Sequence, residues 1–134
     1  MSALYPKFKE SLMKKEIDLL TDDIKLSLID TGEYTYSAAD QFFDDIPSAA
    51  IIGTSGNLSS KSVTDGVFDA DDVLISGLTG APTIEAVLLW LDSGTPSTSR
   101  LIGFIDQGSG LPINAGAVAV SIVFDNGSDK IFKL

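Results

Sequence analysis

Apolar and polar residues alternate, or fall into short runs, along most of this chain, which is the pattern of β-strands rather than of helices. From residue 24 to residue 28 the apolar positions recur every second residue, and Thr31-Gly32 ends the segment. Residues 84–91, IEAVLLWL, are apolar on both alternating faces. We therefore expect them to form a central strand that is covered on both sides. Its predicted neighbour is a strand at residues 101–105, beyond a polar turn at residues 93–99.

Turn residues predict two hairpins farther along the chain. Asp65-Gly66 supplies the positive φ angles of a tight turn within residues 62–69. Near the C-terminal end, Asp125-Asn126-Gly127 predicts a turn that leads back into a strand at residues 130–134. The strand expected before that turn carries apolar residues on one face, namely Val118, Val120, Ile122 and Phe124.

Two segments have helical periodicity. In residues 1–16 the apolar side chains are spaced by three and four, and Pro6 lies in the first turn, where proline is tolerated. A helix this short is not stable alone in water, so its apolar stripe must dock on its own domain or on another chain. Residues 37–47 predict a second short helix, which Ser37 caps and Pro47 ends.

The chain has 134 residues, of which 44% are hydrophobic, and a mean hydropathy of +0.24. This is enough for one domain with a buried core. We expect a single domain over residues 1–134, with an amphipathic arm or helix at 1–16 and a β-rich body at 24–134. The predicted fold class is mainly β: an antiparallel β-sandwich or jelly-roll-like barrel with an N-terminal helix and one further short helix. Neither a signal peptide nor a membrane span is predicted.

Composition narrows the chemistry. Nine Lys and Arg residues stand against nineteen Asp and Glu residues, for a net charge of −10, which argues against binding to nucleic acid. The chain contains neither Cys nor His, which excludes thiol nucleophiles, imidazole bases and nearly all zinc sites. Its glycine pairs lack the remaining residues of phosphate-binding loops. We therefore expect no enzyme activity and no cofactor.

Two weaker signals remain open at this point. Asp69, Asp71 and Asp72 invite a calcium interpretation, but the positions that complete an EF-hand loop are occupied by other residues, and a solvated strand edge is favoured. Trp90 could stack on a sugar, but within an apolar strand a core position is favoured.

The charge is unevenly distributed. Residues 1–16 hold four lysines and two glutamates, a local charge of +2, which leaves −12 for the remaining residues. A basic segment with an apolar stripe is suited to contact an acidic neighbour. The residues that we expect to contact a partner are Leu4, Tyr5, Lys7, Phe8, Lys9, Leu12, Lys14 and Lys15.

Several segments together resemble a group of small virion proteins of tailed bacteriophages. The similarity lies in residues 3–12, 17–31 and 34–47, and in VFDADDV, EAVLLW, FDNG and the final KIFKL. It implies a capsid decoration or cement protein on the outer surface of the shell, made in the host cytoplasm. It also implies that the major capsid protein is the partner, that the protein forms a homo-oligomer, commonly a trimer, and that there is no enzyme activity and no cofactor.

On this basis we expect residues 1–16 to form an arm that reaches a neighbour, so that deleting them abolishes capsid binding and leaves the β-rich body folded. Two other functions fit the sequence. One is a component of the phage tail, neck or baseplate. The other is a receptor- or glycan-binding module that uses Trp90 and the loops near Asn57 and Ser97.

Overall fold

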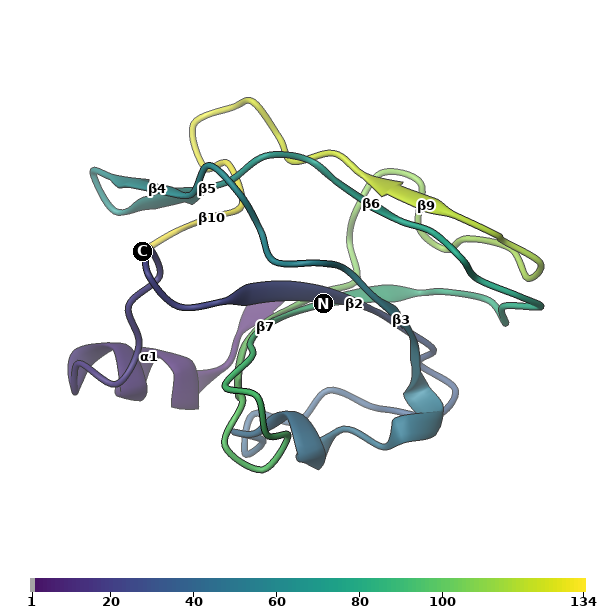
Figure 1. Ribbon diagram of the computed structural model, residues 1–134, viewed down its shortest axis with the longest axis horizontal. Coiled ribbons are helices and arrows are strands. Elements are labelled where there is room, and N and C mark those ends of the chain that lie inside the picture. Colours follow the sequence, from purple (N-terminus) through teal and green to yellow (C-terminus); the bar gives the residue numbers. More distant parts are fainter. Residues whose placement is uncertain (1) are drawn as a thin grey trace.

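The structure, a computed structural model, describes residues 2–134 and is mainly β, with 31% strand and 11% helix. Antiparallel sheets form a β-sandwich-like fold with one α-helix near the N-terminus, as the sequence predicts (Figure 1). The central layer is a five-stranded sheet in the order β1-β8-β7-β2-β3. Its strands are β1 (Ala3–Leu4), β2 (Ile24–Ile29), β3 (Ile51–Thr54), β7 (Ala86–Leu91) and β8 (Arg100–Ile105).

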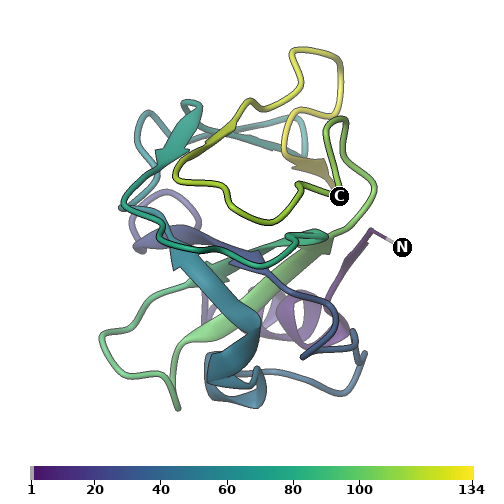
Figure 2. The ribbon, with the colours of Figure 1, turned by 90° about the vertical axis from the view of Figure 1, so that its right-hand side faces the viewer.

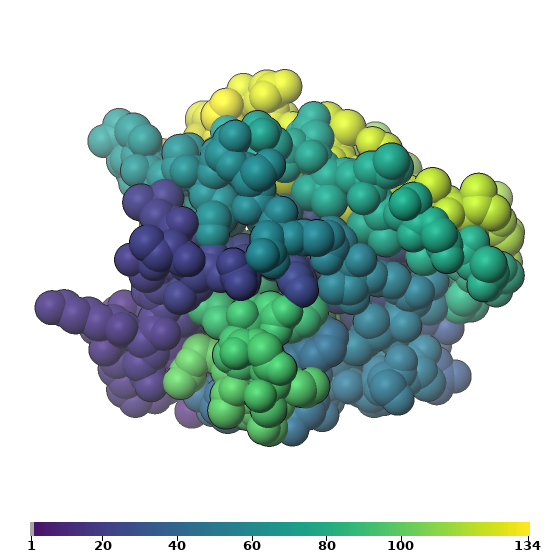
Figure 3. All heavy atoms as spheres, in the orientation of Figure 1, coloured from purple at the N-terminus to yellow at the C-terminus, as the bar shows by residue number. Residues whose placement is uncertain are grey.

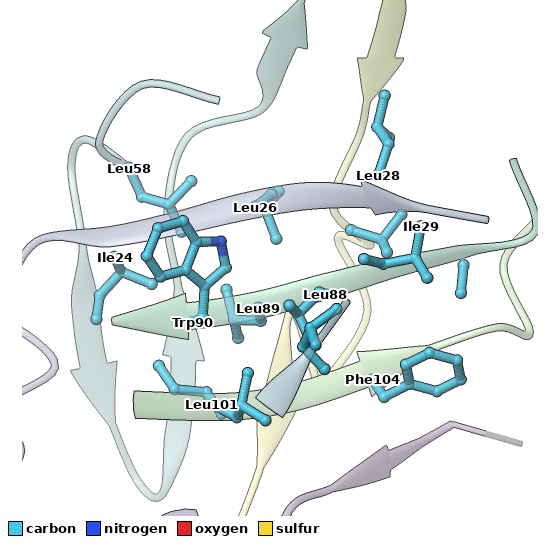
Figure 4. Packing of buried hydrophobic residues seen from close by; sticks show 14 of the residues in the cluster. Ile24, Leu26, Leu28, Ile29, Leu58, Leu88, Leu89, Trp90, Leu101 and Phe104 are labelled. Atoms are coloured by element: carbon cyan, nitrogen blue, oxygen red, sulfur yellow. The ribbon is translucent and has the colours of Figure 1, made fainter. Parts of the chain in front are cut away.

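The middle of this sheet is buried on both faces. Every residue of β7 is buried, and in β2 only Lys25 is partly exposed. The two strands are in full antiparallel register, with Leu26 opposite Leu89 and Leu28 opposite Val87. Figure 4 shows the side chains of these strands packing together with Leu101 and Phe104 of β8. The doubly covered strand expected at residues 84–91 is thus confirmed.

A second layer of two small sheets covers one face of the central sheet (Figures 1 and 2). One sheet has the order β10-β5-β4, from β4 (Ser62–Thr64), β5 (Val67–Asp69) and β10 (Phe132–Lys133). The other pairs β6 (Val73–Ile75) with β9 (Val120–Ile122). Asp65 and Gly66, at φ of 52° and 80°, make the tight turn between β4 and β5, so the hairpin predicted at residues 62–69 is confirmed.

The hairpin predicted at the C-terminal end is wrong. β9 pairs with β6 and β10 pairs with β5, so the two segments on either side of residues 125–127 belong to different sheets. Pairing with β6 lets Val120 and Phe124 of this segment point into the core, while Val118 is 68% exposed. The burial available against the central sheet, rather than the local turn signal, decides the pairing.

The opposite face of the central sheet is covered by loops and short helices. The helix α1 (Pro6–Met13) forms as predicted, but the helix expected at residues 37–47 does not. The structure has instead two 3₁₀ turns, η1 (Phe43–Asp45) and η2 (Ser48–Ala50). The backbone before η1 is used otherwise, because the Gln41 carbonyl accepts from Leu101 and the Phe43 N–H donates to Ser99.

The ring of Trp90 lies in the core of this face. Its side chain is 6% exposed and stacks on Phe43, with ring centroids 3.8 Å apart. The indole Nε1–H donates to Ser27 Oγ at 2.9 Å. The core position predicted for Trp90 is confirmed, and a glycan-binding surface built on this ring is ruled out because the ring is covered.

Candidate functional site

The apolar side of the N-terminal segment packs on its own domain. Tyr5 is 0% exposed and Phe8 is 1% exposed. The backbone of β1 pairs with β8, and the Tyr5 N–H donates to the Ile102 carbonyl at 3.0 Å. The Phe8 ring meets Phe132 of β10 edge-on, with centroids 5.7 Å apart. The expectation that these residues form a separate arm reaching another chain is therefore wrong.

A chain of hydrogen bonds ties the start of α1 to the loop after β2. The Tyr5 hydroxyl lies 2.9 Å from the Tyr34 hydroxyl, which donates to Asp40 Oδ2 at 2.7 Å. Burial, with the Tyr34 hydrogen bond and the nearby charge of Asp40, raises the pKa of Tyr5 well above its usual range. Burial raises the pKa of Tyr34 to about 12. Both phenols therefore stay neutral at physiological pH.

The eight residues expected to contact a partner separate into two groups. Leu4 and Leu12 pack against the core at partial burial, and Tyr5 and Phe8 are fully buried. The four lysines are on the surface, Lys7 being half-buried and the other three exposed. We call these lysines the cationic face of α1: Lys7, Lys9, Lys14 and Lys15. In the space-filling view of Figure 3 the purple N-terminal segment forms the lower left corner of the molecule.

One carboxylate lies within the cationic face. Glu10 accepts from Lys14 at 2.7 Å and from Lys7 at 3.4 Å. Its hydrogen bond to Lys14 lowers the pKa of Glu10 and raises that of Lys14. Within residues 2–134, Lys9 and Lys15 make no ion pair. Exposed pairs of this kind contribute little to stability, so the face is free to exchange them for a partner's carboxylates.

The end of α1 holds Lys15 in an unusual conformation. Lys15 N–H donates to the Leu12 carbonyl at 3.2 Å and Glu16 N–H to the Ser11 carbonyl at 2.9 Å, the pair of bonds of a Schellman motif. Lys15 has φ of 62°, at the position where glycine is usual. Met13, just before it, is 81% exposed. The fold thus presents an apolar side chain and two cations together at this end of the helix.

The three aspartates of the calcium interpretation act separately. Asp69 lies 3.8 Å from Lys130 Nζ, Asp71 accepts from Ser59 Oγ at 3.3 Å, and Asp72 accepts from the Phe124 N–H at 2.9 Å. In residues 2–134 no group of three or more Cys, His, Asp or Glu side chains is arranged to hold a metal ion. Over the same residues, no helix combines the length and apolar character needed to span a bilayer.

A cleft of about 490 Å³ opens at the far end of the central sheet from Ile24. Its aromatic lining is Tyr34, Tyr36 and Phe104, and its carboxylates are Glu85 and Asp106. The Glu85 carboxylate accepts from the Thr31 N–H at 2.9 Å. The sequence analysis did not single out this cleft, because its residues come from three segments whose neighbourhood depends on the strand pairing. The two tyrosines spaced by two in TYTYS are the only local signal.

Comparison with known proteins adds no relative: no protein-family model matches this chain, and no curated protein is significantly similar to it.

Proposed function

We propose that this protein is a structural protein of a tailed-bacteriophage virion and decorates the outer surface of the capsid. The proposal starts from the sequence resemblance, which extends over most of the chain. Manufacture in the host cytoplasm and attachment to the assembled shell follow from the same resemblance. The partner is the major capsid protein.

The observation that carries the proposal is the rigid cationic face in a molecule of net charge −10. Because Tyr5 and Phe8 are buried beneath α1, the lysines are held on a fixed helix rather than on a flexible tail. A fixed group of charges loses less conformational entropy on binding than a mobile one. The cationic face is therefore the surface by which the protein meets its neighbours on the particle.

The mechanism is one of buried area rather than of chemistry. A body that covers parts of two capsid subunits resists their separation, and an interface of about 1,600 Å² is enough for specific attachment. Copies that engage several subunits at once gain further affinity, because each later contact forms at high effective concentration.

Co-sedimentation with empty capsids tests the proposal. We expect the protein to sediment with capsids at low salt, and high salt to release it, since attachment through lysines is screened. The variant Lys9→Glu/Lys14→Glu should bind at least about tenfold more weakly. Lys133→Glu, which reverses an exposed charge on β10, is the control and should bind like the unaltered protein.

Failure of the unaltered protein to sediment with capsids at any salt concentration would refute the decoration role. Counting copies in intact virions separates the main alternative, because hundreds of copies indicate the shell and a dozen or fewer indicate the tail, neck or baseplate.

A further inference from the structure

The cleft at the end of the central sheet has the lining of a site for an organic cation. Tyr34 and Tyr36 each pack against Phe104, with centroids 6.0 Å and 5.6 Å apart, and so form a continuous aromatic wall. Glu85 and Asp106 add two carboxylates, and the described residues that line the cleft include no lysine or arginine. Aromatic faces and carboxylates both attract ammonium groups.

The cleft also has apolar surface that a small cation would leave uncovered. Leu111 and Pro112 complete the lining beside the aromatic wall. A ligand that fills such a space presents an apolar group next to its positive charge. Methionine is well suited to the apolar part, because its sulfur makes favourable contacts with aromatic rings.

The end of α1 on a second copy presents this combination. Met13 is 81% exposed, and Lys14 and Lys15 follow it directly. Lys15 keeps a left-handed backbone conformation that glycine would adopt at lower cost. A side chain retained at a strained position is a reason to look for a binding role.

The two surfaces lie at opposite ends of one molecule, so a copy cannot satisfy its own cleft. Tyr5, at the start of α1, contacts Tyr36 of the cleft wall with ring centroids 5.0 Å apart, and the helix runs away from there for eight residues. A helix of that length spans about 12 Å. Figure 1 shows α1 at the lower left, while the loops that follow β2 and precede β7 are at the right.

We propose that the cleft of one copy binds the Met13-Lys14-Lys15 end of α1 from a second copy. This inference rests on the proposed function, because it names another copy as the neighbour that the cationic face meets on the particle. Two different surfaces meet in such a contact, so repetition builds a ring or an open chain of copies. The contact is small, so it is weak between free molecules and becomes effective where the shell holds copies side by side.

Complementary charge variants test the contact in solution. Lys14→Glu/Lys15→Glu removes the inserted cations and leaves the cleft intact. Thr35→Lys places a cation in the cleft at an exposed position and leaves α1 intact. We expect the average mass of the unaltered protein in sedimentation equilibrium to rise with concentration at physiological salt. Each variant alone should associate at least about tenfold more weakly.

Mixing the two variants gives the sharpest outcome. The first variant retains a cleft and the second retains an inserting helix end, so the mixture should form 1:1 dimers and nothing larger. Lys133→Glu and Thr64→Lys make matched charge changes at exposed sites away from both surfaces and should behave like the unaltered protein. Circular dichroism of every variant establishes that each is folded.

Three results would overturn the inference: an unaltered protein that stays monomeric at all concentrations, variants that associate as well as it does, or a mixture that does not pair. Capsid co-sedimentation of the same variants distinguishes the two proposals. Capsid binding without self-association refutes this contact alone. Self-association without capsid binding refutes the decoration role and leaves the contact between copies standing.

Discussion

On the inner side of α1, Phe8 is 1% exposed and packs against Phe132, whereas on the outer side Met13 is 81% exposed. The same short helix therefore has one side that belongs to the core and another that faces solvent with lysines. The inner side fixes the position of the outer one. A basic segment that looks detachable in the sequence is thus a rigid part of the domain, and its two sides should respond differently to substitution.

Deleting residues 1–16 should have the largest effect, because it removes both sides at once. The edge of β8 would lose its partner β1, and the core would lose Tyr5 and Phe8. We expect the remaining chain to lose cooperative thermal unfolding and to aggregate, as followed by circular dichroism and light scattering. A truncated protein that melts cooperatively near the temperature of the full chain would show that residues 24–134 fold alone and that the inner side is dispensable.

Single substitutions separate the two sides. Phe8→Ala should lower the free energy of unfolding by about 3–5 kcal/mol, because it leaves a cavity beside Phe132. Met13→Ala, its matched control on the outer side, should change the free energy of unfolding by less than about 0.5 kcal/mol. Urea unfolding measures both. Equal losses for the two variants would contradict the division of the helix into a core side and a solvent side.

Alkaline pH tests the hydroxyl pair that anchors the inner side. The pKa of Tyr34 is about 12 in the folded state, and the pKa of Tyr5 is raised as well, whereas an unperturbed tyrosine titrates near 10. Because the folded pKa lies above the unfolded one, this stabilisation is fully present below about pH 10 and is lost as pH rises toward 12.

The measurement is the free energy of unfolding as a function of pH, with Tyr5→Phe as the comparison. The variant retains the Tyr34 bond to Asp40 and should lose less stability above pH 10 than the unaltered protein. Identical pH profiles would exclude a contribution from the Tyr5 hydroxyl.

Lys15→Gly should have the smallest effect and the opposite sign. Glycine adopts the φ of 62° without the steric cost of a side chain, so the free energy of unfolding should rise by about 0.5–1 kcal/mol. If Lys15 inserts into a second copy, the same variant should associate more weakly while being more stable. A variant that is less stable than the original would show that the Lys15 side chain has a structural role within its own domain.

Much of the fold could be predicted from local pattern. The apolar run of β7, the alternation of β2 and the Asp65-Gly66 turn each determine a strand or hairpin with little help from the rest of the chain. The predictions that were wrong used the same kind of signal where tertiary contacts compete with it. Residues 37–47 have helix caps, but their backbone bonds to the β8 region instead. Asp125-Asn126-Gly127 is a turn sequence, but its flanking strands find better burial against β6 and β5.

The candidate site shows the same limit. Composition alone identifies the cationic segment and excludes thiol and imidazole chemistry, because charge and residue type need no three-dimensional information. Which side of α1 is available could not be predicted, since an apolar stripe fits its own domain and a partner equally well. Residues of the cleft lie near positions 34, 85 and 106, and no spacing rule connects them.

The sequence by itself determined the mainly β class, the position of the first helix and the separation of a basic head from an acidic body, because these depend on local periodicity and on charge. Tertiary structure alone decided that the head is anchored, that the two last strands belong to separate sheets, and that three distant segments enclose an aromatic, acidic cleft. The physical reason is that burial against a shared core is a property of the whole chain, and it overrides local preferences wherever the two disagree.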